Sequence, residues 1–289
     1  MALSSATPSV RAPAVAGTFY PAPARTLQHD VDDLLERAAS LKGFSSVYGL
    51  VSPHAGYVYS GFTAAHAYKV IRGRKFDAVV VVGPSHQEYF QGVSVYPGES
   101  YRTPLGVVPI NRELRERMVC DEKRIFLSAA GHRGEHSVEV QLPFLQRVLG
   151  EFSFVPVVMG DQTLELCENL SVAITSAVQG QSVLLVASSD LSHYHPYNEA
   201  MSLDQRVIEL VDSFDPTRLM ERLDHRELEA CGGGPIVTVM LAARKLGANS
   251  ARVVHYCNSG DVTGEKDAVV GYLSAIISKE SSDLPPRVN

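Results

Sequence analysis

Three apolar segments of strand length are each followed by a polar motif with residues that can bind a metal ion or move a proton. His54 lies in SPHAGYVYSG, His86 in VVGPSHQEY, and Asp190 and His193 in VASSDLSHYH. Ligands of parallel sheets bind beyond the carboxyl ends of the strands, where several loops converge. We therefore expect these four side chains to meet at one edge of one sheet.

A single histidine after a strand is more often an ordinary loop residue or a hydrogen-bonding partner than a ligand. The equivalent placement of three motifs favours a common site over that simpler explanation. His29, His66, His132, His225 and His255 have no such context, and we interpret them as structural or surface residues.

Cys231 lies in EACGGGPIVTVMLAARKLG, where Pro235 suits the first turn of a helix and the glycines permit close approach. The positive end of a helix favours the thiolate, which binds metal ions or attacks electrophiles. The alternative is a small buried thiol in a tight turn. The glycines at 232–234 lack the Lys-Ser/Thr of a phosphate-binding loop. Three further cysteines fall in helix or strand contexts, and we interpret them as structural: Cys120, Cys167 and Cys257.

His136 and Glu139 lie three residues apart at the expected start of a helix, in GEHSVEVQLPF. They could share one helix face and reach the pocket. They could equally form a solvated first turn, with the acidic residue matched to the helix dipole.

The elements that position these residues alternate between strand and helix, and residues 93–109 have the pattern of a hairpin. DAVVVV at 77–82 and SVLLVA at 182–187 are typical of parallel strands buried on both faces. The alternation predicts an α/β fold, with a mostly parallel or mixed central sheet flanked by helices. The expected strands are 48–52, 77–82, 154–158, 182–187, 252–256 and 268–277, and the expected helices are 25–41, 61–71, 137–149, 163–178, 199–214, 216–222 and 235–246.

The 289 residues could form one large domain or two small ones, but no linker of disordered composition divides them. We expect a single domain over residues 11–278, a flexible N-terminal arm over 1–10 and a flexible tail over 279–289. Residues 1–24, rich in Ala, Pro and Ser, indicate an irregular segment.

The charge pattern argues against nucleic acid and anionic membranes as partners. The formal charge is 26 − 32 = −6, and Lys and Arg are scattered along the chain. No apolar stretch approaches the roughly 18 residues of a membrane span. The N-terminus lacks a basic and an apolar signal region, so we expect a cytoplasmic protein with reduced thiols.

Seven motifs occur in a specific order: VAGTFYP at 15–21, SPHAGYVYSG at 52–61, GPSH at 83–86, EHSVEVQLPFLQ at 135–146, SSDLSHY at 188–194, ACGGGPI at 230–236 and NSGD at 258–261. This series resembles the Memo family, known in prokaryotes as AmmeMemoRadiSam system protein B. The resemblance extends from about residue 11 to residue 277. Each motif alone is weak, but the ordered set is specific.

The resemblance implies a fold like that of class III extradiol ring-cleaving dioxygenases, in which two His and a carboxylate bind non-haem Fe(II). In the Memo family a Cys replaces the carboxylate. Carried over by motif, the ligands are His54, His86 and Cys231, with Asp190 and His193 beside them. The remaining candidates, which would line the pocket or support the ligands, are His136, Glu139 and Tyr57, with Tyr20 and Tyr59 as further cavity-lining candidates.

The implied function is a redox or oxygen-using metalloenzyme, dioxygenase-like, acting on an unknown small substrate. His193 would serve as acid or base and Asp190 would orient it. We expect Fe(II), but soft sulfur shifts the preference toward Cu(I) or Zn, and the fold does not dictate ring cleavage. The alternatives are a non-catalytic copper- or iron-binding protein and a metal-free peptide pocket. The expected partners are a small molecule or peptide and other proteins, including a radical-SAM protein.

Overall fold

The two apolar runs at 77–82 and 182–187 form neighbouring strands at the centre of the molecule. These strands are β3 (Ala78–Pro84) and β9 (Val183–Ser188), and they pair in parallel. Every residue of both strands is buried, because helices cover both faces of the sheet. The prediction of buried parallel strands is confirmed.

The computed structural model describes residues 9–280, so the expectations for residues 1–8 and 281–289 lie outside the described residues. In the described range, one nine-stranded sheet has the order β10-β12-β2-β9-β3-β8-β4-β7, with β11 paired to β12. A three-stranded sheet has the order β1-β5-β6. The remaining strands are β1 (Val10–Arg11), β2 (Ser46–Ser52), β4 (Val93–Val95), β5 (Ser100–Thr103), β6 (Gly106–Pro109), β7 (Ile125–Leu127), β8 (Phe154–Met159), β10 (His193–His195), β11 (Ser250–Asn258) and β12 (Val269–Lys279).

The large sheet is mixed. Its central strands β2, β9, β3 and β8 all run parallel. Its flanks are antiparallel, since β12 pairs β2 and β4 pairs β8 in that sense. The predicted α/β fold with a mixed sheet flanked by helices is confirmed.

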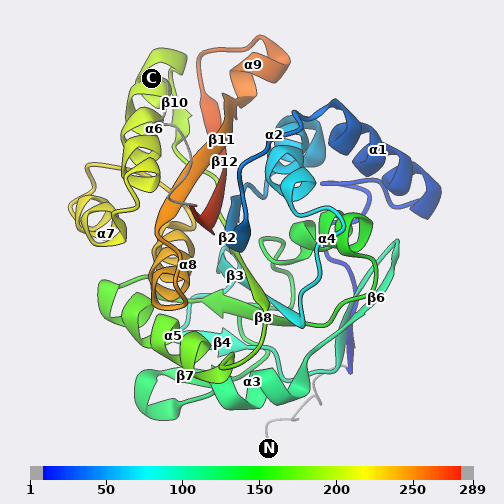
Figure 1. Ribbon diagram of the computed structural model, residues 1–289. Coiled ribbons are helices and arrows are strands. Elements are labelled where there is room, and N and C mark those ends of the chain that lie inside the picture. Colours follow the sequence, from blue (N-terminus) through cyan, green and yellow to red (C-terminus); the bar gives the residue numbers. More distant parts are fainter. Residues whose placement is uncertain (1–8, 281–289) are drawn as a thin grey trace, which may run out of the picture.

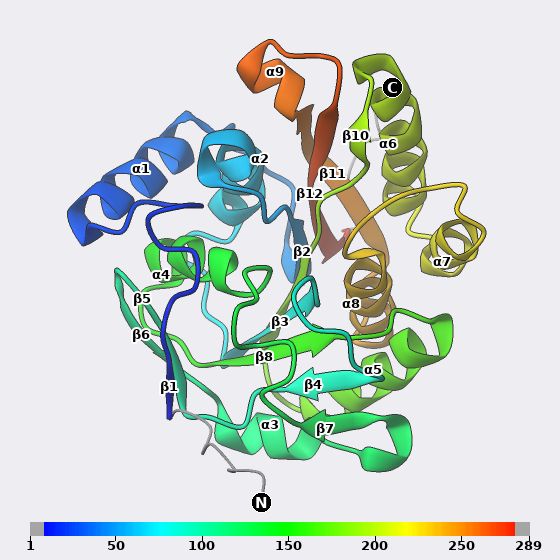
Figure 2. The ribbon, with the colours of Figure 1, turned by 180° about the vertical axis from the view of Figure 1, so that it is seen from behind.

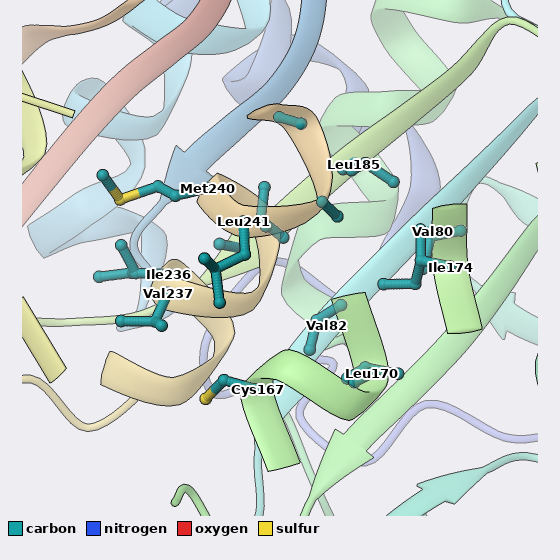
Figure 3. Close-up of a cluster of buried hydrophobic side chains, with 14 of the residues drawn as sticks. Val80, Val82, Cys167, Leu170, Ile174, Leu185, Ile236, Val237, Met240 and Leu241 are labelled. Atoms are coloured by element: carbon teal, nitrogen blue, oxygen red, sulfur yellow. The ribbon is translucent and has the colours of Figure 1, made fainter. Parts of the chain in front are cut away.

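One face of the sheet is covered by α3 (Arg112–Met118), α5 (Leu164–Ala177), α6 (Tyr197–Asp212), α7 (Pro216–Asp224) and α8 (Gly233–Lys245). Alternate strand residues point to this side, as the two-residue period of a strand requires. Figure 3 shows how strands, α5 and α8 meet in this core, with Val80, Val82, Leu185, Cys167, Leu170, Ile174, Ile236, Val237, Met240 and Leu241.

The opposite face is covered by α1 (Ala24–Arg37), α2 (Tyr57–Val70) and α4 (Leu142–Leu149), as Figures 1 and 2 show. Here the intervening strand residues Val79, Val81, Leu184 and Val186 pack against the helices. The small sheet contributes Tyr101 to the same core. In the part of the chain that the structure describes, no helix has the length and apolarity needed to cross a membrane.

Several boundaries differ from the prediction. The helix expected over 137–149 is divided into a 3₁₀ turn, η2 (Glu139–Gln141), and α4, which has a proline in its first turn. The stretch at 93–109 contains the β5–β6 hairpin, but this hairpin belongs to the small sheet. The elements α3, α9 (Ser259–Thr263) and η1 (Asp121–Lys123) were not predicted.

Candidate metal centre

The loops after β2 and β3 bring His54 and His86 together at the carboxyl edge of the sheet, and the segment before η2 adds His136. The ring centroids of His54 lie 5.0 Å from those of His86 and 5.3 Å from those of His136. One ligand nitrogen from each of the three histidines lies within 4.8 Å of the others. This cluster could hold a metal ion.

Hydrogen bonding determines which nitrogen of His54 is free. Ser188 Oγ donates to the Ser137 carbonyl at 2.5 Å and accepts from Gln141 Nε2 at 2.8 Å. It therefore faces His54 Nδ1, 2.9 Å away, as an acceptor. The hydrogen of His54 lies on Nδ1, and Nε2 keeps its lone pair. Burial, helped by the charges of the neighbouring histidines, lowers the pKa of His54 well below its usual range, which favours the neutral, ligating form.

Glu135 orients His86 in the same manner. One carboxylate oxygen lies 3.0 Å from His86 Nδ1, and the other accepts the His86 backbone N–H at 2.5 Å. The carboxylate also accepts the N–H groups of His136 and Ser137, each at 2.9 Å. Burial opposes ionisation of Glu135, but these bonds and the His86 charge outweigh it and hold its pKa well below the usual range. An ionised Glu135 directs the Nε2 lone pair of His86 into the pocket.

His136 lies against His86 rather than opposite it. The two rings stack with centroids 4.8 Å apart and planes inclined by 21°. The ring of Phe19, from the N-terminal segment, also packs against His136, with the two ring centroids 4.7 Å apart. The Nδ1 atom of His136 lies 3.4 Å from a carboxylate oxygen of Glu135.

Cys231 lies directly ahead of α8, as the sequence predicted, and its Sγ is 3.1 Å from His54 Nε2. The expected preference for thiolate is wrong for the metal-free chain. Burial, followed by the charge of Asp190, raises the pKa of the Cys231 thiol and outweighs the N–H groups that point at the sulfur. The neutral thiol is therefore the favoured form in the metal-free chain, and a bound cation would favour loss of its proton.

Asp190 joins the loops that carry His54 and Cys231. Its Oδ1 accepts the His54 backbone N–H at 2.8 Å, and its Oδ2 lies 4.0 Å from His54 Nε2. Its backbone N–H points at Cys231 Sγ at 3.2 Å, and its carbonyl accepts the Cys231 N–H at 3.2 Å. Burial raises the pKa of Asp190. These bonds are those of a residue that positions two candidate ligands.

His193 lies on β10, beside the centre rather than in the histidine cluster. Its Nδ1 is 2.8 Å from the Leu191 carbonyl and therefore carries the hydrogen, so that Nε2 can accept a proton. His193 and Cys231 both line a cavity of about 430 Å³. Its wall is mixed: Leu191, Met220, Leu223 and Leu228 supply apolar surface, and Gln162, Asp224 and Glu229 supply polar and acidic groups.

The structure does not place Glu139 and Tyr57 among the clustered histidines. The Glu139 carboxylate is fully buried and bonds Arg11 and Tyr20, each at 2.5 Å, and the N–H groups of Ala14 and Val15. The Tyr57 hydroxyl donates to the Val140 carbonyl at 2.6 Å. Both residues anchor segments that pack against the site. Tyr20 shares this anchor, whereas Tyr59 is 41% exposed.

The sequence reasoning missed Glu135, Ser188 and Gln141, which orient the candidate ligands. Glu135 had a visible signal, because a carboxylate next to a candidate histidine in one motif can orient a ligating histidine. Ser188 and Gln141 had none, since their role depends on contacts between distant segments. The glycines at 232–234 do not form an open anion cradle, because Ser189 and Gln162 take the N–H groups of Gly232 and Gly234.

Comparison with known proteins links this arrangement to one family. The family described as Memo-like protein matches residues 11–276. A MEMO1 family protein of Methanosarcina barkeri is 40% identical over 271 residues, which cover 93% of this chain and 100% of the relative. A MEMO1 family protein of Thermotoga neapolitana is 38% identical over 280 residues, which cover 93% of this chain and 100% of that relative. One from Nitrosopumilus maritimus is 34% identical over 268 residues, which cover 91% of this chain and 98% of that relative.

A solved structure shares the fold. An uncharacterized protein from Escherichia coli K12 superposes with a TM-score of 0.55 at 17% identity, covering 80% of this chain and 100% of that chain. At this identity the likeness concerns the fold alone.

Proposed function

This chain belongs to the family of Memo-like proteins, and from that premise we propose that it is a metal-binding protein whose ion serves redox chemistry on a small molecule. The single observation that carries the proposal is that His54 and His86 are hydrogen-bonded in the same way. Each ring has its Nδ1 directed at a buried acceptor, Ser188 or Glu135. Each therefore directs a free Nε2 toward the same space, which is the arrangement of metal-binding histidines.

Cys231 is the third donor in this proposal. Its sulfur lies against His54 Nε2, and it can lose its proton to a bound cation. His136 is the competing third donor, because its nitrogen lies within the same cluster. We prefer Cys231 because its sulfur lies 3.1 Å from His54 Nε2, the nitrogen that is free to bind an ion.

The donor set fits iron or copper, since imidazole suits both metals and thiolate favours Cu(I). Such an ion, when bound, would supply a Lewis acid and one-electron redox chemistry. The cavity beside Cys231 has both apolar and polar walls and can admit a small molecule. His193 can take a proton from that molecule at Nε2. Asp190 keeps the loops of His54 and Cys231 in position while the proton is transferred.

Metal analysis of variants tests the ligand assignment. We expect protein purified anaerobically without chelator to contain about one iron or copper ion per chain, by mass spectrometry. His54→Ala, His86→Ala and Cys231→Ser should each lose most of it. His136→Ala should retain it, as should the matched control His225→Ala, which changes an exposed histidine. Full metal content in His54→Ala and Cys231→Ser would show that the assignment is wrong.

Oxygen consumption tests the redox part of the proposal. Protein reconstituted with Fe(II) under anaerobic conditions should consume O₂ when a suitable small aromatic or other apolar substrate is added, and His193→Ala should slow consumption while keeping its metal. Fully loaded protein that turns over nothing in a broad panel would leave metal binding without catalysis as the function.

A further inference from the structure

A fourth strand end reaches the same edge of the sheet. Strand β8 ends at Met159, and Gln162 follows three residues later, just before α5. Gln162 lines the cavity that also contains Cys231 and His193. None of the contacts described for the metal centre so far assigns a function to this side chain.

The carboxamide of Gln162 closes both ends of the turn that carries Cys231. Its Nε2 donates to the Cys231 carbonyl at 2.8 Å, and its Oε1 accepts the Gly234 N–H at 2.8 Å. The fit is close, since a Cβ added to Gly234 would meet the Gln162 Cβ at 2.8 Å. One side chain from the loop after β8 thus bonds both Cys231 and the first turn of α8.

We propose that Gln162 is a positioning residue that holds the Cys231 sulfur at the candidate metal centre. The inference rests on the proposed function in so far as Cys231 is a metal donor. Asp190 and Ser189, from the β9 loop, bond the beginning of the turn at the N–H groups of Cys231 and Gly232. Among the side-chain hydrogen bonds described, the Cys231 carbonyl and the Gly234 N–H depend on Gln162. Without these two bonds the turn can rotate and carry the sulfur away from His54 Nε2.

The first test uses metal-free protein and does not depend on metal binding. The minor thiolate form of Cys231 attacks an aromatic disulfide reagent, forms a mixed disulfide and releases an aromatic thiolate that is measured by its absorbance. We expect Gln162→Leu, which keeps the bulk and removes both bonds, to raise the Cys231 rate roughly tenfold, the equilibrium equivalent of one or two hydrogen bonds. The same variant in a Cys231→Ser background subtracts the other cysteines. Gln205→Leu, at an exposed position of α6, is the matched control.

The second test is a Co(II) titration followed by the thiolate-to-cobalt absorption band. Gln162→Leu should bind Co(II) about 10–100-fold more weakly, as for other outer-shell partners of metal ligands, with a weaker sulfur band. Gln162→Glu keeps an acceptor for Gly234 and loses the donor to Cys231, so an intermediate result is expected. It also replaces Gln162→Leu if that variant does not fold.

The outcomes separate the two proposals. If the wild-type chain binds no metal, the proposed function fails, and the thiol reaction alone decides the role of Gln162. Equal Cys231 rates in Gln162→Leu and wild type, or equal cobalt affinity and sulfur absorption, overturn the positioning role.

Discussion

At the scale of single residues, the candidate centre depends on groups that no ion would touch. Glu135 accepts four hydrogen bonds from His86, His136 and Ser137, and so ties two of the clustered histidines to one carboxylate. Ser188 does the same for His54 through a single hydroxyl. The rings are held in their orientation before any ligand arrives.

Replacing Glu135 by glutamine should weaken metal binding without removing a ligand. The amide has one oxygen in place of two, and its NH₂ group faces backbone donors, so the orientation of His86 is lost. We expect the dissociation constant to rise about 10–100-fold, measured by competition with a chromophoric chelator. The exposed variant Glu113→Gln on α3 is the control. An unchanged constant would mean that His86 does not need this partner.

His132 should make stability depend on pH. It is fully buried, with Nδ1 2.7 Å from the Tyr101 hydroxyl and Nε2 3.2 Å from the Ser94 carbonyl. Burial lowers its pKa to about 3. Above a pH of about 6.5 the ring is neutral in both folded and unfolded chains. Between that pH and about 3 the unfolded chain binds the proton first, so the free energy of unfolding falls as the pH falls.

The measurement is the free energy of unfolding in urea at several pH values between 8 and 4. The difference between wild type and His132→Gln should shrink by up to about 1.4 kcal/mol for each pH unit below the normal histidine pKa. Parallel pH profiles for the two proteins would contradict the assignment.

The sequence located the candidate ligands because strand ends are visible as apolar runs. His54, His86, Asp190 and His193 could be assigned to one edge for that reason. The state of Cys231 could not, because its environment is set by burial and by Asp190, 41 residues away. Gln162 was equally hidden, since its bonds connect the loop after β8 to Cys231 and to the first turn of α8.

At the scale of elements, the N-terminal segment runs over the surface and is anchored by two buried side chains, Arg11 and Tyr20. Arg11 donates to the carbonyl groups of His132 and Glu135 and forms an ion pair with Glu139. Tyr20 bonds the same carboxylate. Composition rich in Ala, Pro and Ser indicated the lack of regular structure, but the buried ion pair depends on a partner 128 residues away.

Replacing Arg11 by methionine should destabilise the fold strongly. The substitution leaves the Glu139 carboxylate buried without its cation, which costs about 3–5 kcal/mol. Urea unfolding followed by circular dichroism measures this cost. Arg112→Met, which removes an exposed ion pair with Glu99, should cost less than about 1 kcal/mol. Adding Glu139→Gln to Arg11→Met should restore part of the loss, and no recovery would mean that the ion pair is not the cause.

The helix boundaries show where periodicity stops being informative. Apolar spacing predicted one helix over 137–149, but the structure has a 3₁₀ turn over Glu139–Gln141 that continues into α4. The apolar period does not distinguish these two forms. The seven-residue α3 is too short for a clear period, and its cap, Asn111 accepting the Leu114 N–H, is a local signal that was overlooked.

At the scale of the whole molecule, the two hydrophobic cores share one sheet, because adjacent residues such as Val79 and Val80 belong to opposite cores. We therefore expect one cooperative unfolding transition, with circular dichroism and tyrosine fluorescence coinciding. Leu35→Ala on α1 and Leu185→Ala on β9 should each cost about 2–5 kcal/mol. Their costs should add, since they lie in different cores. Two separate transitions would argue for two domains.

The separation of the donors along the chain has a consequence for biosynthesis. His54 and Cys231, whose ring nitrogen and sulfur lie 3.1 Å apart, are 177 positions distant in sequence. During translation the two histidine loops leave the ribosome long before the cysteine turn does. A nascent chain therefore presents imidazoles alone, and thiolate coordination begins only once synthesis has passed Cys231. Under the proposed ligand assignment, metal delivery would thus be a late event, directed at a nearly finished fold.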